Sequence, residues 1–393
     1  MSASSLTKVR EARTARIAFI MPRHSHDDAR VAHKEAWTLQ DRGYDVVLLC
    51  KHAPVSEYLG MRVFAARAGA QGLLRPFLNL PSLARQALEL KADLYLLVNP
   101  DTLLLGVLLT ILGKRIIYST QEDFLRKVEI HPNIPRVIAK LVGGGICAGE
   151  HLLARISSAT IATQPNVHER YAPHAILAVN APLTEGPVAS EARRLSTQLP
   201  YPALPTLVYA GRISRDRGLC RMLDLLAGLN EIRPWRMKLM GEFLTSADRN
   251  QAHQHRAWPW VEYLGVVPHA VSLAHIRQSD IGLAILDDVG GYSRTSITKL
   301  YEYMLMETPF VASDFREWRE SIEDVPAGLF VDGLNSAELT RLVDELLADR
   351  QRYEMMRTAG RTYIEQRFNW HIVSEPIQEA VSRQLQSVAA GAR

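Results

Sequence analysis

Two arginines in the second half of the chain have the type and spacing to bind a diphosphate. Arg212 and Arg217 lie in the segment Gly211–Gly218, directly after a short apolar run that ends at Ala210. A guanidinium group is always charged and donates hydrogen bonds in a planar fork, which suits it to phosphate oxygens. The two glycines bracket a turn, so both arginines can point at one anion.

A second phosphate-binding signal begins at Thr295. Thr295, Ser296 and Lys299 stand at the start of a predicted helix, whose free N–H groups and positive dipole end attract anions. Glu302 follows within that helix, where a carboxylate can accept hydrogen bonds from a ribose diol. Lys299 has two interpretations, since it can bind a phosphate oxygen or neutralise Glu302. The two segments together predict a nucleoside-diphosphate site.

Polar side chains also follow three predicted strands of the first half. The residues are His24, His26, Asp27 and Asp28 after one strand, Asn99 after another, and Gln121 and Glu122 after a third. Ligands of open parallel sheets bind outside the carboxyl ends of the strands, so we expect these side chains to line a second substrate site. Helix capping is the alternative for each loop, since Asp27, Asp101 and Thr120 stand where helices could begin.

The first of these groups admits three chemical roles. If the reaction needs a general base, the candidates are His24, His26, Asp27, Asp28 and Glu122, because a base must reach the acceptor hydroxyl. Asp27 and Asp28 fit acceptor positioning better. A metal site is the third role, but ligands this close in sequence need a further partner elsewhere. We therefore expect no metal.

The elements that must position these residues follow an α/β pattern, in which short β-rich runs alternate with longer amphipathic stretches. Strands are predicted at Arg16–Met21, Asp45–Cys50, Met61–Ala65, Leu94–Val98, Arg115–Ser119, Thr160–Thr163 and Ile176–Val179, then at Thr206–Ala210, Arg236–Leu239, Val261–Leu264, Ile281–Ile285 and Phe310–Ala312. Helices are predicted at Ala29–Asp41, Pro81–Leu90, Leu219–Leu229, Ala270–Arg277, Lys299–Met306 and Ala337–Ala348. The proline-rich segment Pro182–Pro205 is interpreted as an inter-domain connection. The pattern predicts two doubly wound domains facing one another.

Composition excludes several classes of protein. The 393 residues are 47% hydrophobic and 22% charged, which excludes a disordered chain or a collagen-like fibre and predicts two or three domains. The 3 cysteines form neither a disulfide framework nor a zinc motif. The N-terminus lacks the apolar segment of a secretory signal, and the most apolar run, Leu103–Leu112, is too short to span a bilayer. We expect a cytosolic protein that does not cross a membrane.

The net charge of +4 hides an asymmetry between the halves. Residues 1–200 hold 24 Lys+Arg against 17 Asp+Glu, whereas residues 201–393 hold 22 against 25. The basic half suggests an anionic partner, either a membrane surface or a phosphate-bearing acceptor. A scatter of solvated surface charge is the alternative.

The sequence lacks the motifs of two common classes of nucleotide-binding protein. The loop Pro22–Arg30 contains no glycine, so the G-x-G-x-x-G signature of dinucleotide enzymes is missing after the first strand. No Walker-type G-x-x-x-x-G-K-[ST] occurs either, because no Lys-Ser or Lys-Thr follows the run Gly143–Gly145. We interpret that run as a flexible turn.

Two longer motifs carry a family resemblance. Gly211, Arg212, Arg217 and Gly218 match G-R-x-x-x-x-[KR]-G, and the segment Lys299–Ala312 matches K-L-x-E-Y-M followed by P-x-V-A. At these residues the chain resembles the nucleotide-sugar-dependent glycosyltransferases of the GT-B fold, most closely glycosyltransferase family 4. Looser matches extend the resemblance from about Arg16 to about Gln384.

The resemblance implies an arrangement of domains and a donor site. An acceptor-binding domain would comprise residues 1–182, a donor-binding domain residues 183–367, and a final helix, about 368–393, would cross back to the first domain. Arg212 and Arg217 would neutralise the departing diphosphate, so neither a metal nor another cofactor would be needed.

Further donor contacts are implied by the same resemblance. Glu302 would bind the ribose, and the backbone near Val266 and Val267 would meet the nucleobase. Gly241 would also belong to the donor site. His24, His26, Asp27, Asp28, Asn99 and Gln121 would belong to the acceptor side. Family 4 enzymes retain the anomeric configuration, with the departing phosphate taking the acceptor's proton, so no strong protein base is implied.

Three positions depart from the family pattern. Arg294 stands where a donor-sugar Glu is usual, Glu307 replaces an expected Gly, and Ser119–Glu122 replaces Asp-x-His-Glu. Arg294 would either favour a carboxylated donor sugar or point into solvent. These departures affect the donor-sugar contacts.

We therefore expect a hexosyltransferase that uses a nucleoside-diphosphate sugar, UDP-linked, and a glycan, lipid-linked or small-molecule acceptor. An anionic membrane surface is a further expected partner, which would place the protein in the cytoplasm or at the inner membrane face; nucleic acid is not expected. The alternatives are a sugar-nucleotide epimerase and an inactive GT-B protein that binds another enzyme.

Overall fold

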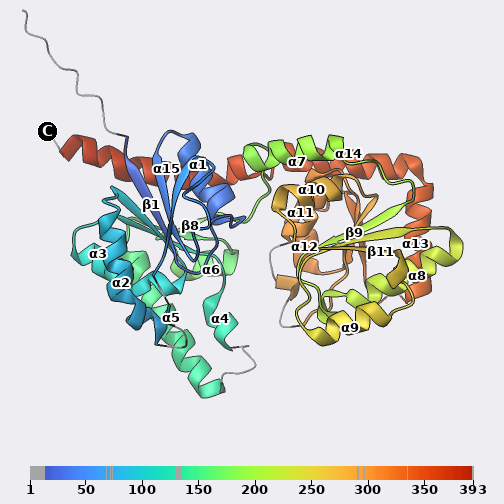
Figure 1. Ribbon diagram of the computed structural model, residues 1–393, viewed down its shortest axis with the longest axis horizontal. Helices are drawn as coiled ribbons and strands as arrows, with labels where there is room; N and C mark the ends of the chain where they lie inside the picture. Colours follow the sequence, from blue (N-terminus) through green and yellow to red (C-terminus); the bar gives the residue numbers. More distant parts are fainter. Residues whose placement is uncertain are drawn as a thin grey trace, which may run out of the picture. The chain divides into compact units, whose positions relative to one another are not determined.

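The chain forms two α/β units, each built around its own sheet (Figure 1). The computed structural model describes residues 14–391, except residues 68, 71, 73, 130–134, 290, 291, 295, 296 and 334. The first unit runs to Val179 and includes the segment from Ser374 onward, and the second is Asn180–Val373. The predicted fold class, α/β with two parallel-sheet domains, is confirmed.

The first unit contains an eight-stranded sheet in the order β3-β4-β2-β1-β5-β6-β7-β8. The strands are β1 Arg16–Met21, β2 Asp45–Cys50, β3 Glu57–Tyr58, β4 Met61–Ala65, β5 Leu94–Val98, β6 Ile116–Thr120, β7 Ala159–Ala162 and β8 Ala175–Leu177. Only the short β3–β4 pair among the described strands is antiparallel. Because β1 lies between β2 and β5, the strand order reverses there, which makes the carboxyl ends of β1 and β5 a place where ligands bind.

Helices cover both faces of this sheet. They are α1 Trp37–Asp41, α2 Arg75–Glu89, α3 Leu103–Ile111, α4 Phe124–Glu129, α5 Arg136–Ile156, α6 Pro165–Tyr171 and α15 Trp370–Gly391. Alternate residues of each strand point to opposite faces. Ala18 and Ile20 accordingly pack with Leu83 of α2, Leu105 of α3 and Leu153 of α5, on the face opposite α1 and α15 (Figure 1).

The second unit contains a six-stranded, fully parallel sheet in the order β11-β10-β9-β12-β13-β14. The strands are β9 Thr206–Ala210, β10 Arg236–Met240, β11 Val261–Gly265, β12 Ile281–Ala284, β13 Phe310–Ser313 and β14 Gly328–Val331. Its order reverses between β9 and β12, so the loops after these two strands form the corresponding ligand-binding edge.

The helices of the second unit are α7 Pro187–Gln198, α8 Leu219–Ile232, α9 Ser246–Gln254, α10 His269–Arg277, α11 Thr298–Leu305, α12 Arg316–Ser321, α13 Ser336–Ala348 and α14 Arg350–Gln366. Figure 1 shows α7, α10 and α14 on one face and α8, α9 and α13 on the other. Trp235, Leu226 and Val343 are fully buried in the core beneath α8 and α13. Burial of such side chains stabilises each by about 1.5–3 kcal/mol relative to exposure.

Two local predictions from the sequence were wrong, and a third was correct in place but not in helix type. The proline-rich Pro182–Pro205 contains α7, which packs against α10, so it is not simply a connection. The predicted helix Ala29–Asp41 begins with a π-helical turn, Val31–Ala36, before α1. The glycine run Gly143–Gly145 lies inside α5 rather than in a turn, because an amphipathic helix continues on both sides of it.

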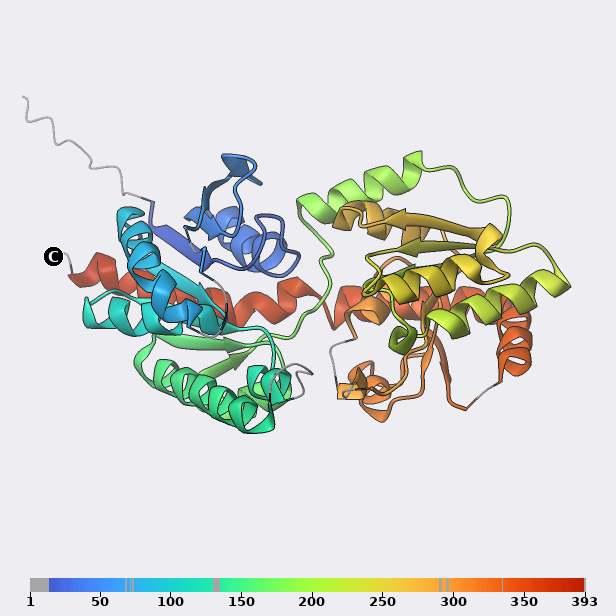
Figure 2. The same cartoon turned by 60° about the horizontal axis from the view of Figure 1, so that its bottom comes forward.

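α5 has one packed face and one exposed face. Inward, the carboxylate of Glu150 accepts hydrogen bonds of 2.6–2.8 Å from the hydroxyls of Tyr118, Thr120 and Tyr171. Outward, Val137 and Leu141 are each 72% exposed. Among the described residues, α5 is the one helix long and apolar enough to cross a membrane by length and composition. The sequence search missed this helix, which is the long green helix of Figure 2.

Candidate functional site

The turn after β9 is shaped by close backbone approaches that require glycine. Gly218 has a φ of 82°, and a Cβ atom there would lie 1.8 Å from the carbonyl oxygen of Ile285 after β12. Gly241 after β10 has a φ of 133°, and its Cβ would lie 1.9 Å from the carbonyl oxygen of Gly211. A side chain at either position would collide with backbone. The loops after β9, β10 and β12 therefore pack directly together at the switch point of the sheet.

The two predicted arginines differ in their surroundings. Arg212 is exposed, whereas Arg217 is half-buried with its guanidinium 4.8 Å from the ring centroid of Tyr292. The Nε of Arg217 is buried and has no hydrogen-bond partner among the described residues. A buried donor without a partner is costly, and a phosphate oxygen would satisfy it.

Lys299 of α11 reaches the same turn. Its Nζ lies 5.1 Å from the ring centroid of Tyr209, and a Cβ on Gly211 would lie 2.8 Å from its Cε. Burial, followed by the charge of Arg217, lowers the pKa of Lys299 to about 8, although Glu302 acts in the opposite direction. Two cations that repel each other in this way are stabilised by an anion between them. The geometry favours phosphate binding over simple neutralisation of Glu302.

Glu302 is held by a residue that the sequence search missed. The Nε2 of His269, at the start of α10, lies 2.9 Å from Glu302 Oε1. Both side chains are mostly buried, with exposed fractions of 17% and 22%. His269 stands three residues after Val266, which is a predicted nucleotide contact. This closeness in sequence was the one signal that could have identified it. The pair fixes the direction of the carboxylate.

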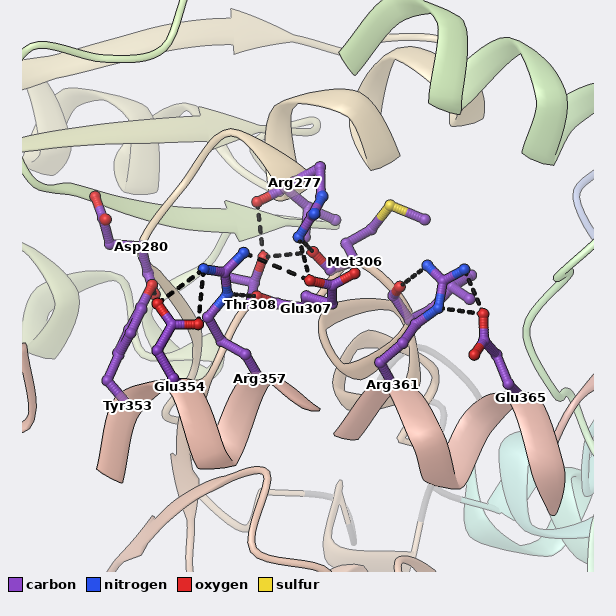
Figure 3. Close-up of polar contacts among 12 residues, drawn as sticks. Arg277, Asp280, Met306, Glu307, Thr308, Tyr353, Glu354, Arg357, Arg361 and Glu365 are labelled. Atoms are coloured by element: carbon purple, nitrogen blue, oxygen red, sulfur yellow. Dashed lines mark hydrogen bonds and ion pairs between the residues drawn. The ribbon is translucent and has the colours of Figure 1, made fainter. Parts of the chain in front are cut away.

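The C-terminal end of α11 is braced by arginines (Figure 3). Glu307 has a φ of 55°, a left-handed conformation that explains why a glycine is expected there. Its carboxylate lies 2.9 Å from Arg277 and 3.5 Å from Arg357, and the Nε of Arg357 donates to its carbonyl oxygen. Arg361 donates to the carbonyl of Leu305. These cations at the negative end of the helix dipole hold α11, and hence Lys299, in place.

The other predicted donor residues are only partly described. Val266 is 78% exposed after β11, at an edge strand of the sheet, where its backbone is accessible to a ligand. Thr295 and Ser296 lie outside the described residues, so their predicted contacts remain predictions. Arg294 ends a short 3-10 turn, Tyr292–Arg294.

In the first unit, three predicted acceptor residues form one hydrogen-bonded group. The Nδ1 of His24 lies 2.8 Å from Asp28 Oδ2, and its Nε2 lies 2.8 Å from the Nδ2 of Asn99. The Oδ1 of Asn99 accepts from the backbone N–H of Gln121 at 3.1 Å, which leaves Nδ2 as the donor to His24. In this arrangement, the neutral tautomer of His24 that fits both contacts carries its proton on Nδ1.

This group has little capacity to act as a base. The lone pair of His24 Nε2 is already occupied by Asn99. Asp28 Oδ1 accepts the backbone N–H groups of Arg30 and Val31 at 2.9 and 2.8 Å. Burial raises the pKa of Asp28, but hydrogen bonding to His24 and these amides outweighs it, so the pKa is lowered. The arrangement positions groups rather than accepting protons.

The remaining predicted acceptor residues have separate contacts. His26 packs edge-on against Tyr58 with centroids 5.0 Å apart, and Asp27 is exposed. Glu122 forms an ion pair with Lys127 of α4. The Nε2 of Gln121 is buried without a hydrogen-bond partner among the described residues, which makes it available to a ligand.

Metal ligands do not gather anywhere in the described part of the chain. No group of three or more His, Cys, Asp or Glu residues there could hold a metal ion. The His24–Asp28 pair has an amide, Asn99, as its third neighbour, which is a poor substitute for a charged or imidazole ligand.

A buried ion pair fixes the end of the first unit. Arg30 Nε lies 2.8 Å from Glu35 Oε1, and its two other nitrogens donate to the carbonyls of Val179 and Ala178. These carbonyls precede Asn180, where the chain enters the second unit. Both side chains are almost fully buried. Through its two hydrogen bonds, Arg30 holds the backbone at Ala178 and Val179 in place.

Comparison with known proteins finds a family match within the second unit. Residues 204–349 match the family model of the glycosyl transferases group 1. A phosphatidyl-myo-inositol mannosyltransferase from Mycobacterium leprae is 30% identical over 183 residues, which are 45% of this chain. The chain spans about half the length of that relative, 46%.

Solved structures match almost the whole chain. A sucrose-phosphate synthase from Thermosynechococcus elongatus has a TM-score of 0.68 and 17% identity, covering 95% of this chain and all of that one. The HepE protein of Anabaena, solved with UDP and glucose, has a TM-score of 0.67 and 17% identity, with 94% and 100% coverage. The resemblance drawn from the sequence is confirmed: the chain has the GT-B fold, and residues 204–349 of its second unit match the glycosyl transferases group 1 model.

Proposed function

We propose that the protein transfers a hexosyl group from a nucleoside-diphosphate sugar, UDP-linked, to a glycan, lipid-linked or small-molecule acceptor. The observation that carries this proposal is the meeting of Arg217 and Lys299 at the turn after β9, beside the pair of Glu302 and His269. Cations and a fixed carboxylate in one place suit a diphosphate and a ribose. The solved complexes of HepE with UDP and UDP-glucose support the choice of nucleotide.

The transfer we propose retains the anomeric configuration. The bond from the anomeric carbon to the phosphate oxygen breaks while the acceptor oxygen bonds on the same face, and the acceptor proton passes to the departing phosphate. Negative charge grows on the diphosphate, so Arg212, Arg217 and Lys299 stabilise the transition state more than the ground state. These side chains would supply the charge that a divalent cation supplies in other transferases.

The first unit fits the acceptor side of such a reaction. A retaining transfer of this kind needs no strong protein base, which agrees with a His24 whose Nε2 is occupied by Asn99. We assign His24, Asp28 and Asn99 to shaping the acceptor site.

Nucleotide release distinguishes this function from its alternatives. The full chain is incubated with UDP- and GDP-sugars, with and without candidate acceptors, in the presence and absence of EDTA. Acceptor-dependent nucleotide release that EDTA does not affect is expected. An altered sugar still attached to its nucleotide would instead indicate an epimerase, and no binding of any nucleotide sugar would overturn the assignment of Arg217, Lys299 and Glu302.

We further propose that the protein lies at the inner, cytoplasmic face of a membrane through α5. The outward residues Val137, Leu141 and Leu152 form an exposed apolar stripe, and Arg136 and Lys140 flank its first turns. An amphipathic helix with apolar and basic groups binds anionic lipid surfaces in the plane of the interface. Glu150 keeps the opposite face of α5 attached to the protein.

A further inference from the structure

The first unit contains a cavity of about 790 Å³ at the carboxyl edge of its sheet. Its wall includes residues that follow β1, β2 and β4 and residues at the start of α2. The ionisable side chains in this wall are Arg23, Lys51, His52, Arg67, Arg75 and Asp101. A cavity of this volume is large enough for a substrate-sized molecule.

The charge of this cavity is strongly positive. Arg23, Lys51, Arg67 and Arg75 contribute four cations, and Asp101 is the one carboxylate in the wall. Asp101 lies 2.5 Å from the Nε of Arg75 and 3.8 Å from Arg23, so its charge is already shared. No carboxylate of the described chain lies within ion-pair distance of Lys51 or Arg67. The wall therefore has an excess of cations that face no anion.

These cations lie beside the acceptor group. Arg23 directly precedes His24, and Asp101 is two residues after Asn99. Both segments follow the strands β1 and β5, at which the order of the sheet reverses. The cavity therefore borders the loops that carry His24 and Asn99, although neither of these two residues is part of its wall.

We propose that this cavity binds the phosphate group of the acceptor. A carboxylate carries one charge and is satisfied by a single guanidinium, whereas a phosphate offers more charge and more oxygens and can meet several cations at once. Asp101 is suited to hold Arg75 and Arg23 in place for that contact. The proposal rests on the proposed function, because it names the acceptor class of the same reaction.

The phosphate can belong to a soluble ester or to a lipid headgroup, and the experiment separates these sources. Binding of glycerol 1-phosphate to the full chain is measured by calorimetry, and binding of phosphatidylglycerol vesicles by co-sedimentation. The variants are Lys51→Gln, Arg67→Gln and the double variant. Arg85→Gln is the matched control, since Arg85 lies on α2 outside the cavity and is 80% exposed. Glucuronic acid is the carboxylate probe.

We expect each single variant to bind the phosphate probe about 10-fold more weakly, and the double variant about 100-fold, because each lost charge-assisted hydrogen bond costs about a factor of ten or more. Arg85→Gln should bind as the unaltered chain does. Loss with glycerol 1-phosphate indicates a soluble acceptor, and loss with vesicles alone a lipid acceptor; both support the proposal.

Equal phosphate binding by all variants, no binding of either probe, or equally tight binding of glucuronic acid would overturn it. UDP binding is measured on the same samples. The double variant should keep its affinity for UDP, because Arg217 and Lys299 lie in the other unit. A protein that binds the phosphate probe but no nucleotide would contradict the proposed function and leave the cavity assignment standing.

Discussion

At the scale of single residues, Lys299 shows how burial and a neighbouring cation together favour the binding of an anion. Its pKa of about 8 results from burial and from Arg217, so the protein holds two mutually repelling cations before any ligand arrives. A bound diphosphate would relieve that repulsion and raise the pKa again. Nucleotide binding should therefore be coupled to the protonation of Lys299.

This coupling gives a pH-dependent prediction. Below pH 8 Lys299 is charged and binds the diphosphate, and above pH 8 it loses its proton, so nucleotide affinity should fall as the pH rises from 7 to 9. Lys299→Met should bind UDP about 10-fold more weakly at pH 7 and lose this decline. Calorimetry with UDP across this range tests it. Lys238→Met is the control. Burial also lowers the pKa of Lys238, but this residue lies within β10 and not at the proposed diphosphate site. An unchanged decline in Lys299→Met would contradict the prediction.

His269 gives a second prediction at this scale. His269→Ala should raise the KM for the nucleotide sugar several-fold and leave kcat nearly unchanged, because losing one hydrogen bond of about 1 kcal/mol frees Glu302 without touching the diphosphate. His269→Gln should recover part of the loss. His253→Ala, at an exposed position on α9, is the control. A fall in kcat at unchanged KM would show that His269 acts elsewhere.

At the scale of elements, the proposed donor site depends on how α11 is held at both ends. Its first turn carries Lys299 to the loop after β9, and its last turn ends at Glu307, whose left-handed backbone is held by Arg277 and Arg357. Glycine would adopt this conformation without strain. The chain has a glutamate here instead. Its two ion pairs stabilise the left-handed backbone conformation that glycine would adopt without strain.

The exposed face of α5 allows a prediction for membrane binding. Leu141→Glu should weaken binding to phosphatidylglycerol vesicles at least several-fold. The substitution removes apolar surface that would be buried in the lipid, and it adds a negative charge that anionic lipids repel. The fold should be unaffected, since Leu141 is 72% exposed. Ile232→Glu, at an exposed position on α8, is the control. Vesicle co-sedimentation measures the effect, and equal binding by both variants would exclude α5 as the contact.

At the scale of the whole molecule, charge and ligand chemistry are divided between the units. Residues 1–179 and 374–393 hold 24 basic and 17 acidic residues, whereas residues 180–373 hold 22 and 25. The proposed nucleotide site lies in the acidic unit, so the cations of that site do not reflect the net charge of the unit. The excess of positive charge belongs to the unit that contains the cationic cavity and α5.

This division predicts where a nucleotide protects the backbone. Saturating UDP should slow amide hydrogen exchange in the loop Gly211–Gly218 and in α11, since a ligand stabilises the states to which it binds. The strands β1 and β2 of the first unit should exchange at unchanged rates. Mass spectrometry of peptides from the full chain tests this. Protection confined to the first unit would show that the nucleotide binds there, and would contradict the proposed site in the second unit.

The class of fold and much of the strand pattern could be predicted from periodicity, because apolar alternation records which residues are buried. β1, β2 and β9 have the predicted bounds, and the arginines of Gly211–Gly218 could be identified from their spacing. The polar loops after β1 and β5 could also be predicted to meet, since parallel strands share one carboxyl edge.

What the tertiary structure alone decided are contacts between segments far apart in the chain. The pairing of His269 with Glu302, the lowered pKa of Lys299 and the tautomer of His24 each depend on distances that no local pattern records. The glycine run in α5 was mistaken for a turn, because helix formation there depends on packing of the face that carries Glu150. Sequence spacing determines which residues share an element, and packing determines which elements bring them together.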